Sequence, residues 1–319
     1  NDHTNYLTAG ILELKGNFEQ KSTYTSGNAH LNFNATETHK VILSGEGAQS
    51  ISFEDSSYSG FKKLDCPNDD IKFVSMVRGW KMTSDIILSS ALGTVGTLDV
   101  NGKHLTVGGN FLLSGALNVN RGIMSITGDL NSTGSLTIDS GILNIGGNLI
   151  QSNGMIKPNG GRLEIAGDYR IQNATTAADG TVTYSYCWGY LNMTNDSDYV
   201  KVGGRFVMDS ANDHTNYLTA GILELKGNFE QKSTYTSSGS PHKNFNATEM
   251  HKVILSGEDT QTYTFEDPTY SHFKILEITD PSLKNLTISF NSQGGSSVNS
   301  VTSAYNTKIG APVPPTKAG

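Results

Sequence analysis

Short runs of alternating apolar and polar residues fill the middle of the chain, and such alternation is typical of strands rather than helices. The stretch GTLDVNGKHLTVGGNFLLS, residues 96–114, holds three of these runs. Its alternate apolar residues are Leu98, Val100, Leu105, Val107, Phe111 and Leu113. The next two stretches repeat the pattern with Leu117, Val119, Met124, Ile126 and Leu130, and then with Leu136, Ile138, Leu143, Ile145 and Leu149. We expect all of these side chains to face an apolar core.

The glycine that precedes a polar turn residue recurs at Gly109, Gly128, Gly147 and Gly167, in steps of 19, 19 and 20 residues. A fixed period of this size indicates a solenoid, in which each repeat buries its apolar face against its neighbours. Three short strands per repeat predict three parallel sheets around a narrow core, and parallel crossovers are strongly biased toward right-handed winding. The sequence therefore predicts an all-β fold, a right-handed parallel β-helix (β-solenoid) with three-strand coils of about 19 residues.

A polar residue follows the glycine at these corners and at similar corners elsewhere in the chain. The residues are Asn110, Asp129, Asn148, Asp168, Arg205, Asn228 and Asn17. Asn and Asp tolerate the left-handed conformation that a tight corner needs. Stacked coils would align these side chains about 4.8 Å apart, where we expect them to hydrogen-bond to one another. A calcium site at Asp129 and Asp168 is an alternative, which the uncharged asparagine between them disfavours.

A second, longer repeat flanks the coils. Residues 1–26 recur unchanged at 212–237, and after a one-residue insertion the segments NFNATE, HKVILSGE and FED-x-x-Y-S-x-F-K-x-L recur as well. The spacing is 211 residues before the insertion and 212 after it. Identity this complete indicates recent duplication, so we expect the chain to be a piece of a longer tandem array.

These repeats divide the chain into four parts. They are an N-terminal β module at 1–95, regular coils at 96–211 with an insertion at 173–190, a second copy of the long repeat at 212–291, and a linker-like tail at 292–319. The insertion lies in the step of 37 residues from Gly167 to Gly204, which exceeds one coil by about 18 residues. Loops that project from a regular solenoid often carry function, so a site is expected here.

Alternate positions near the end of the insertion are aromatic: Tyr184, Tyr186, Trp188 and Tyr190. If this segment is a strand, the four rings point to one face, about 6.6 Å apart. Flat rings with polar edges are suited to stacking on sugars, so these four residues are the candidate ligand-binding set. The alternative is that the rings cover an exposed flank of the core, with the tyrosine hydroxyls at the water boundary.

Carboxylates gather near the insertion at Asp196, Asp198, Asp209 and Asp213, with His214 beside the last of them. A pair of carboxylates could do acid–base work on a glycosidic bond. However, the Asp-His pair also occurs at residues 2–3, and residues 195–198 resemble an ordinary polar turn. We therefore expect no catalytic residue, no metal and no cofactor. Positions repeated in both modules, for which we expect structural roles, are His39 and His251, Tyr58 and Tyr270, and Phe61 and Phe273.

Composition narrows the class of protein further. Charged residues make up only 17% of the chain and 35 of its 319 residues are glycine, which suits many short strands joined by tight turns. A net charge of −7 without a basic cluster argues against nucleic-acid binding. No run of 18 apolar residues predicts a membrane span, and residues 1–20 do not resemble a signal peptide. Cys66 and Cys187 make no disulfide framework, and whether they pair stays open.

The coil pattern G-x-L-x-V-x-G-x-L-x-V-x-G-N-F, over residues 96–230, resembles the repeats of secreted bacterial β-helix surface proteins, including filamentous adhesins. The segment NFNAT-x-x-HKVILSG, at 32–45 and 244–257, resembles modules of large exported proteins of anaerobic Gram-positive bacteria. Among β-helical attachment proteins, the tapirins, which are cellulose-attachment proteins, are the nearest named family. This resemblance implies an extracellular, non-catalytic, cellulose-adhering role.

Three functions are compatible with these patterns. The first is an extracellular adhesin, secreted or attached to the cell surface, whose aromatic row binds an insoluble polysaccharide or a cell-surface glycan. The second is a stalk or fibre subunit that self-associates end to end, since matching coils near both ends could stack one subunit on another. The third is a polysaccharide lyase or hydrolase, which the fold alone does not imply. The first is the function we expect.

Overall fold

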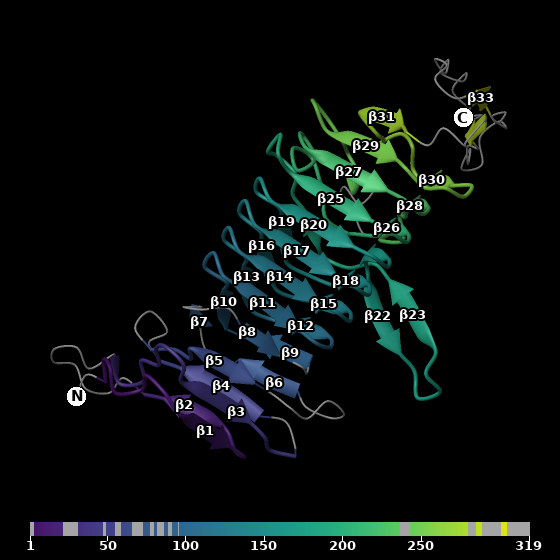
Figure 1. Cartoon of the computed structure of the whole chain (residues 1–319). Helices are drawn as coiled ribbons and strands as arrows, with labels where there is room; N and C mark the ends of the chain where they lie inside the picture. Colours follow the sequence, from purple (N-terminus) through teal and green to yellow (C-terminus); the bar gives the residue numbers. More distant parts are fainter. Residues whose placement is uncertain are drawn as a thin grey trace. The chain divides into compact units, whose positions relative to one another are not determined.

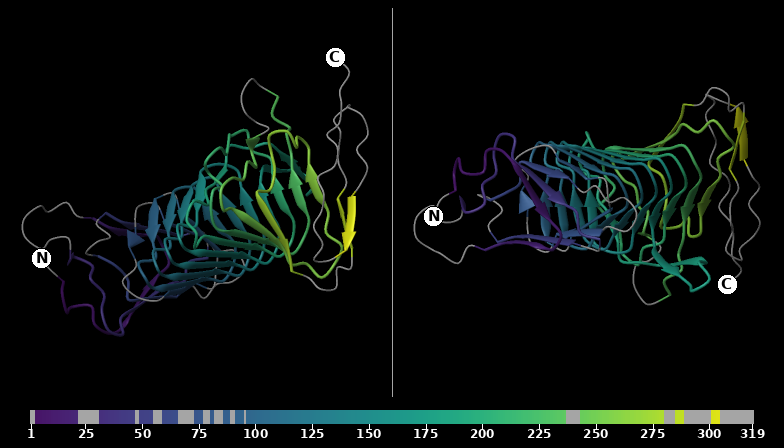
Figure 2. Two further views of the ribbon diagram at one scale, coloured as in Figure 1. Left: turned by 90° about the horizontal axis from the view of Figure 1, so that it is seen from above. Right: turned by 60° about the horizontal axis from the view of Figure 1, so that its bottom comes forward.

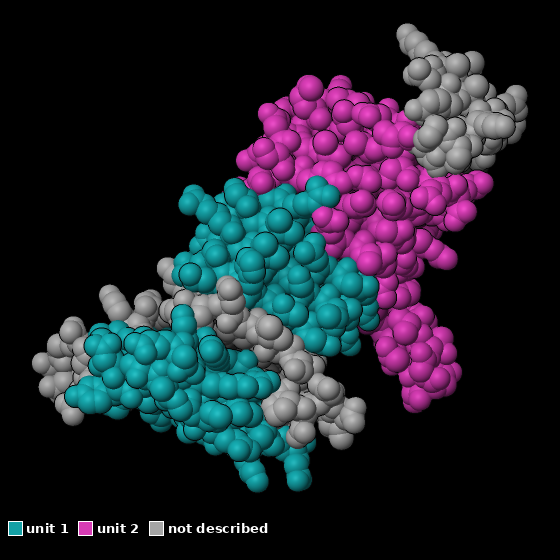
Figure 3. Space-filling view, in the orientation of Figure 1, with its two compact units in different colours: residues 1–147, 161–163 teal, residues 148–160, 164–319 magenta. Residues whose placement is uncertain are grey.

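A computed structural model describes residues 3–21, 31–46, 49–54, 59–65, 73–76, 80–81, 86–88, 91–94, 96–236, 243–279, 285–288 and 301–304. Within these ranges the chain forms strands and turns without an α-helix, which confirms the all-β prediction. The strands assemble into long parallel sheets with a solenoid-like arrangement. The chain divides into two compact units, residues 1–147 with 161–163 (unit 1) and residues 148–160 with 164–319 (unit 2) (Figure 3).

The regular coils of unit 1 have three strands each, as predicted (Figure 1). The first coil contains β10 (Thr97–Asp99), β11 (His104–Val107) and β12 (Phe111–Leu113), and the second contains β13 (Ala116–Asn118), β14 (Ile123–Ile126) and β15 (Leu130–Ser132). Each strand pairs in parallel with its counterpart 19 residues later, Leu98 with Leu117 and Phe111 with Leu130. The pattern extends to β16 (Ser135–Thr137) and β17 (Ile142–Ile145).

The core of the coils consists of the residues that the alternation predicted. None of the sixteen apolar side chains named from the three stretches exposes more than 2% of its surface. Because successive side chains of a strand point to opposite faces, the residues between them lie on the outer wall. This burial confirms the predicted inward set.

The corners of the coils use two different devices. Left-handed backbone conformations occur between the first and second strands of a coil, at Asn101 (φ 53°), Asn120 (φ 45°), Asp139 (φ 48°) and Asn159 (φ 51°). They do not occur at Asn110, Asp129, Asn148 or Asp168, so that part of the sequence prediction is wrong. The polar residues after the glycines serve a different purpose.

At those glycine corners a side-chain oxygen of one coil accepts a hydrogen bond from a backbone N–H of the next. Asn110 Oδ1 accepts the N–H of Asp129 at 2.8 Å, Asn148 Oδ1 that of Asp168 at 2.9 Å, and Asp168 Oδ1 that of Arg205 at 2.8 Å. We predicted that these side chains would bond to one another, whereas these bonds run from side chain to backbone.

Two of the glycines that precede these polar residues, Gly128 and Gly147, leave room for this column. A Cβ atom at Gly128 would overlap Asn110 Oδ1, and one at Gly147 would overlap Asp129 Oδ1. The 19-residue recurrence of glycine is thus a steric requirement of stacking the polar corners.

Unit 2 contains further parallel strands. One sheet holds β18 (Leu149–Gln151), β21 (Tyr169–Ile171), β26 (Phe206–Met208), β28 (Phe229–Gln231) and β30 (Tyr263–Phe265). A second holds β25 (Tyr199–Val202), β27 (Ile222–Leu225), β29 (Lys252–Leu255) and β31 (Ile275–Ile278). In a third, β19 (Met155–Lys157) pairs with β24 (Tyr190–Leu191). The strand β20 (Arg162–Ile165) falls on the boundary between the units.

The two copies of the long repeat fold alike, one in each unit. In unit 1, β1 (Ile11–Leu14) pairs with β3 (Lys40–Leu43) and β3 with β5 (Lys63–Asp65), as β27, β29 and β31 do in unit 2. The strand β2 (Phe18–Gln20) likewise pairs with β4 (Gln49–Phe53), as β28 does with β30.

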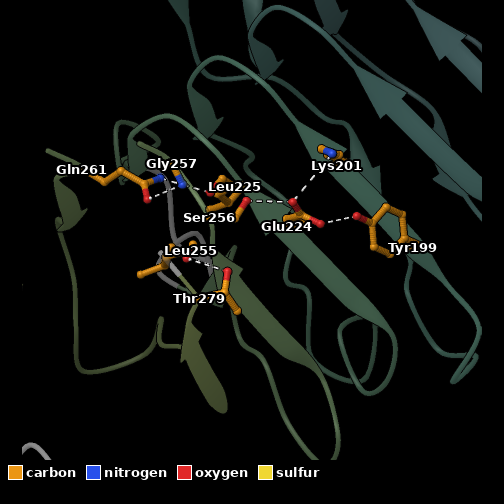
Figure 4. Close-up of polar contacts among 9 residues, drawn as sticks. All are labelled: Tyr199, Lys201, Glu224, Leu225, Leu255, Ser256, Gly257, Gln261 and Thr279. Atoms are coloured by element: carbon orange, nitrogen blue, oxygen red, sulfur yellow. Dashed lines mark hydrogen bonds and ion pairs between the residues drawn. The ribbon is translucent and has the colours of Figure 1, made fainter. Parts of the chain in front are cut away.

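The two copies also share the hydrogen bonds of a glutamine side chain at one corner of the coil. Gln49 accepts the N–H of Gly45 at 2.9 Å and donates to the carbonyl of Leu14 at 3.1 Å. Gln261 accepts the N–H of Gly257 at 3.1 Å and donates to the carbonyl of Leu225 at 3.1 Å (Figure 4).

Segments between and after these elements form further strands. In unit 1 these are β6 (Phe73–Met76), β7 (Trp80–Lys81), β8 (Ile86–Leu88) and β9 (Ala91–Thr94), and β6 pairs in parallel with both β4 and β9. In unit 2, β32 (Asn285–Ile288) and β33 (Val301–Ala304) form an antiparallel pair. Tyr58, Cys66 and the rest of the tail predicted at 292–319 lie outside the described residues.

Candidate functional site

The insertion leaves the coil wall of unit 2 as a β-hairpin. It consists of β22 (Asn173–Thr176) and β23 (Val182–Ser185), paired antiparallel. Figure 1 and the right-hand view of Figure 2 show it standing clear of the stacked strands. The strand before it, β21, still pairs residue by residue with β26, its counterpart one coil later. The extra residues of the long glycine step therefore lie outside the coil.

Three of the four predicted aromatic residues are exposed. Tyr184 exposes 41% of its surface, Tyr186 37% and Trp188 46%, whereas Cys187 between them is fully buried. The expected alternation is present over residues 186–189, but it does not extend through β23, where Ser185 is exposed as well as Tyr184. Inward anchoring by Cys187 holds the neighbouring rings toward solvent.

Tyr190 occupies a different setting from the other three. It begins β24, pairs with Met155 in the coil wall and is half-buried. Its ring stacks on Tyr217 at 5.1 Å between centroids and lies 5.5 Å from His214. Packing therefore accounts for Tyr190, as the alternative interpretation of the row proposed.

Two residues that the sequence analysis did not single out complete the exposed group. The half-buried ring of Tyr235 contacts both Tyr186 (5.0 Å, 60°) and Trp188 (5.4 Å, 70°) edge to face. The guanidinium of Arg170 lies 4.3 Å from the ring centroid of Tyr184. We call these five residues, Tyr184, Tyr186, Trp188, Tyr235 and Arg170, the aromatic cluster.

Arg170 is held in place by its own hydrogen bonds. Its Nη2 pairs with Asp168 Oδ2 at 2.9 Å and its Nη1 donates to Gln172 Oε1 at 3.2 Å. A guanidinium over an aromatic face is attracted by the ring quadrupole. The contact therefore orients Tyr184, and Asp168 offsets the charge of the arginine.

The thiol beneath the cluster is inert. Cys187 is free and buried, and its Sγ accepts the N–H of Gly189 at 3.3 Å. Burial raises the pKa of Cys187 to about 12, with a further contribution from the negative charge of Asp209. Since only the thiolate is nucleophilic, this side chain serves packing.

Asp198 is one of the carboxylates that sequence analysis weighed for acid–base work, and it closes a turn. Its oxygens accept the backbone N–H groups of Gly160 at 2.6 Å, Thr194 at 2.9 Å and Asn195 at 3.0 Å. A buried carboxylate with three backbone donors is a structural anchor.

Asp209 and Asp213 are also engaged locally. Asp209, which is buried, accepts from the Gln172 amide at 3.2 Å and from the Thr234 hydroxyl at 2.5 Å. Asp213 accepts both the N–H and the hydroxyl of Thr215, at 2.7 and 2.6 Å. Asp196 is exposed. Within the described ranges no three acidic, histidine or cysteine side chains are grouped so that they could hold a metal ion.

His214 is fully buried, and both of its ring nitrogens are used. Nε2 accepts the N–H of Leu191 at 3.2 Å, so Nδ1 carries the proton and donates to the Asn212 carbonyl at 3.1 Å. Burial lowers the pKa of His214 to about 4, although the Asn212 bond and Asp213 act in the opposite direction. The imidazole is therefore neutral at pH 7.

His39 and His251, which the sequence analysis paired, occupy equivalent buried positions in the two modules. The ring of His39 lies 6.1 Å from Phe33, and that of His251 lies 6.0 Å from Phe245, both edge to face. Burial lowers the pKa of both histidines, that of His251 to about 4.

No protein-family model, curated protein or solved structure matches this chain. No helix within the described part could cross a membrane. The fold and the site define an all-β, solenoid-like protein of parallel sheets that presents an exposed aromatic cluster beside a hairpin.

Proposed function

We propose that this protein is an extracellular, non-catalytic polysaccharide-binding module whose aromatic cluster is the binding face. The supporting observation is the exposure of three rings at alternate positions, with Tyr235 and Arg170 packed against them. We also propose that the parallel sheets close into a right-handed β-helix, because parallel crossovers almost always have this hand. Secretion or attachment to the cell surface belongs to the same proposal, because cellulose, xylan, chitin and cell walls lie outside the cytoplasm.

The chemistry of the cluster favours a neutral glycan. Sugar rings have apolar C–H faces and hydroxyl rims, and Tyr and Trp combine an apolar face with a polar edge. The one cation of the cluster, Arg170, is already paired with Asp168. An anionic polysaccharide would also meet a chain of net charge −7.

The test is a pull-down of the whole chain with insoluble cellulose, xylan, chitin and bacterial cell walls. Trp188→Ala removes the most exposed ring of the aromatic cluster and is expected to weaken binding roughly tenfold, the size of effect typical of an aromatic anchor. Tyr235→Ala is expected to weaken it less, because this ring supports its neighbours.

The matched control is Tyr270→Ala, since Tyr270 is 48% exposed but is not part of the aromatic cluster. Binding to none of the four materials would refute the proposal. Equal losses for Trp188→Ala and Tyr270→Ala would refute the assignment of the site.

A stalk or fibre subunit is the second candidate, and the observation in its favour is the duplicated module with its identical fold. Concentration-dependent oligomers in sedimentation velocity would support it. For a lyase or hydrolase, the carboxylates Asp198, Asp209 and Asp213 offer no support, because each is engaged in a turn or a buried hydrogen bond.

A further inference from the structure

Asparagine is followed by glycine at residues 101–102, 153–154 and 159–160. Such pairs are prone to spontaneous deamidation, because glycine has no Cβ atom to shield its backbone nitrogen. That nitrogen attacks Cγ of the asparagine, the Cγ–Nδ2 bond breaks, and ammonia leaves a cyclic succinimide. Water then opens the ring to aspartate or to isoaspartate, in which the backbone runs through the side chain. Whether a pair reacts depends on its local structure.

The fold holds Asn101 in a conformation that does not allow this attack. Its backbone is left-handed, with φ 53°, which turns the next backbone nitrogen to the side of the Cα–C bond away from Cβ. The N–H of Gly102 also donates to the Asn120 carbonyl at 2.8 Å. Reaction at Asn101 therefore requires the corner to open first.

Asn159 is held in the same way. It is also left-handed, with φ 51°. The nitrogen that would attack its side chain belongs to Gly160, and the N–H of Gly160 donates to the buried carboxylate of Asp198 at 2.6 Å. This pair must give up an anchoring hydrogen bond before it can react.

Asn153 has neither the left-handed backbone nor a buried setting. It is exposed, and its φ is not positive. Its corner is also one residue longer than the one before it in the sequence: residues 152–154 join β18 to β19, whereas residues 133–134 join β15 to β16. The additional residue accounts for the 20-residue step from Gly147 to Gly167. An exposed, lengthened corner can change its backbone angles while the apolar core stays in place.

The same corner supports the segment that carries the aromatic cluster. The carbonyl of Ser152 accepts the N–H of Trp188 at 3.3 Å, and the carbonyl of Gly154 accepts the N–H of Tyr190 at 2.8 Å. Asn153 lies between these two carbonyls in the chain. A change in the backbone at Asn153 therefore moves the groups that hold Trp188.

We propose that Asn153 is a site of spontaneous deamidation, and that its conversion to isoaspartate loosens the backbone beneath Trp188. The reaction consumes water, releases ammonia and needs no other reagent. Isoaspartate adds a carbon atom to the backbone between Ser152 and Gly154, and its carboxylate adds a negative charge to the corner. This modification goes beyond the proposed glycan binding and does not depend on it.

The first test is peptide mapping by mass spectrometry, on the whole folded chain after prolonged incubation at mildly alkaline pH. Conversion at Asn153 should be at least roughly tenfold faster than at Asn101 or Asn159, because both of these need a local opening. In concentrated urea the three pairs should react at similar rates, since they share the Asn-Gly sequence. Equal rates in the folded chain, or the same ranking in urea, would overturn the proposal.

The second test is hydrogen exchange at the amides of Trp188 and Tyr190. Exchange should become severalfold faster in the converted wild type. It should stay unchanged in Asn153→Gln incubated alongside, because the longer side chain closes a ring far more slowly. Asn153→Asp carries the charge without the added backbone atom, so it should also exchange at the original rate. Unchanged exchange in the converted wild type would show that the corner tolerates isoaspartate and would overturn the proposed loosening.

Discussion

Acidification should destabilise unit 2 at a pH well above the range in which carboxylates titrate, and His214 should be one cause. Its imidazole is held neutral by burial, with Nε2 accepting from Leu191. Protonation would turn this acceptor into a donor facing an N–H group. The substitution His214→Gln keeps an amide oxygen within reach of Leu191 but removes the titration.

The magnitude follows from the difference between the folded and unfolded pKa values. The unfolded value is 6.5 and the folded value is about 4, so the unfolded chain binds more protons between these limits. The contribution of neutral His214 to the free energy of unfolding is therefore fully present above pH 6.5. It decreases as the pH falls from 6.5 to 4, and below pH 4 it decreases no further. At 1.36 kcal/mol per pH unit, the loss at pH 5 is about 2 kcal/mol. His251, with a pKa of about 4, should contribute a similar loss.

The assay is urea unfolding at pH 7 and pH 5, combined with hydrogen exchange at the Leu191 amide. Between pH 7 and pH 5 the free energy of unfolding should fall by about 2 kcal/mol more in the wild type than in His214→Gln. The control is His3→Gln, which alters the same sequence position in the first copy, where the side chain is exposed. The reasoning is refuted if the wild type and His214→Gln lose the same stability between pH 7 and pH 5. Glu224 cannot mimic the effect, because a carboxylate with a lowered pKa loses its contribution only below its unfolded value of 4.5.

Two further predictions concern packing. A Cβ atom at Gly227 would overlap the Gly204 carbonyl, whereas one at Gly16, the same position in the first copy, would meet nothing within 4 Å. Gly227→Ala should therefore lower the free energy of unfolding by about 1–3 kcal/mol. Gly16→Ala should lower it by less than about 0.5 kcal/mol. Thermal unfolding measures both changes, and equal shifts of the midpoint would contradict this reasoning. Tyr169→Phe should cost about 1–3 kcal/mol, because the buried Gln151 Oε1 loses the hydroxyl that donates to it at 2.8 Å. Urea unfolding measures this loss, and an unchanged midpoint would show that Gln151 finds another donor.

The core of the coils could be predicted from the sequence because it depends on local alternation. Leu98, Leu105 and Phe111 are buried wherever the three strands of a coil face one core. The stacking of Leu98 on Leu117 follows from the repeat length alone.

The corners were predicted only in part. The sequence analysis placed Asn110 at a corner but did not single out Asn101, which lies at the turn between the first two strands of its coil. However, Asn101 adopts the left-handed conformation and Asn110 instead accepts a backbone N–H from the next coil. Both tasks suit asparagine, so composition does not distinguish them.

The candidate site could also be predicted only in part from the sequence. Tyr184, Tyr186 and Trp188 could be predicted from alternation within one segment, whereas Tyr235 and Arg170 reach the cluster from neighbouring coils. These contacts join residues that are far apart in the sequence and meet only when the coils stack, so a local sequence pattern does not predict them. The half-buried position of Tyr190 likewise follows from its pairing with Met155.

The direct pairing of β21 with β26 across the hairpin has a consequence for how such proteins diversify. Tyr169 lies opposite Phe206, which is the pairing that consecutive coils make when no insertion separates them. The corner after Ile171 is therefore a position where a loop can be inserted, shortened or exchanged while the core stays unchanged. Lengthening such a loop costs little, about 0.6 kcal/mol for each doubling. A library built at this corner on a constant scaffold would sample new recognition surfaces, and natural variants of the architecture should differ most in length and aromatic content at that corner.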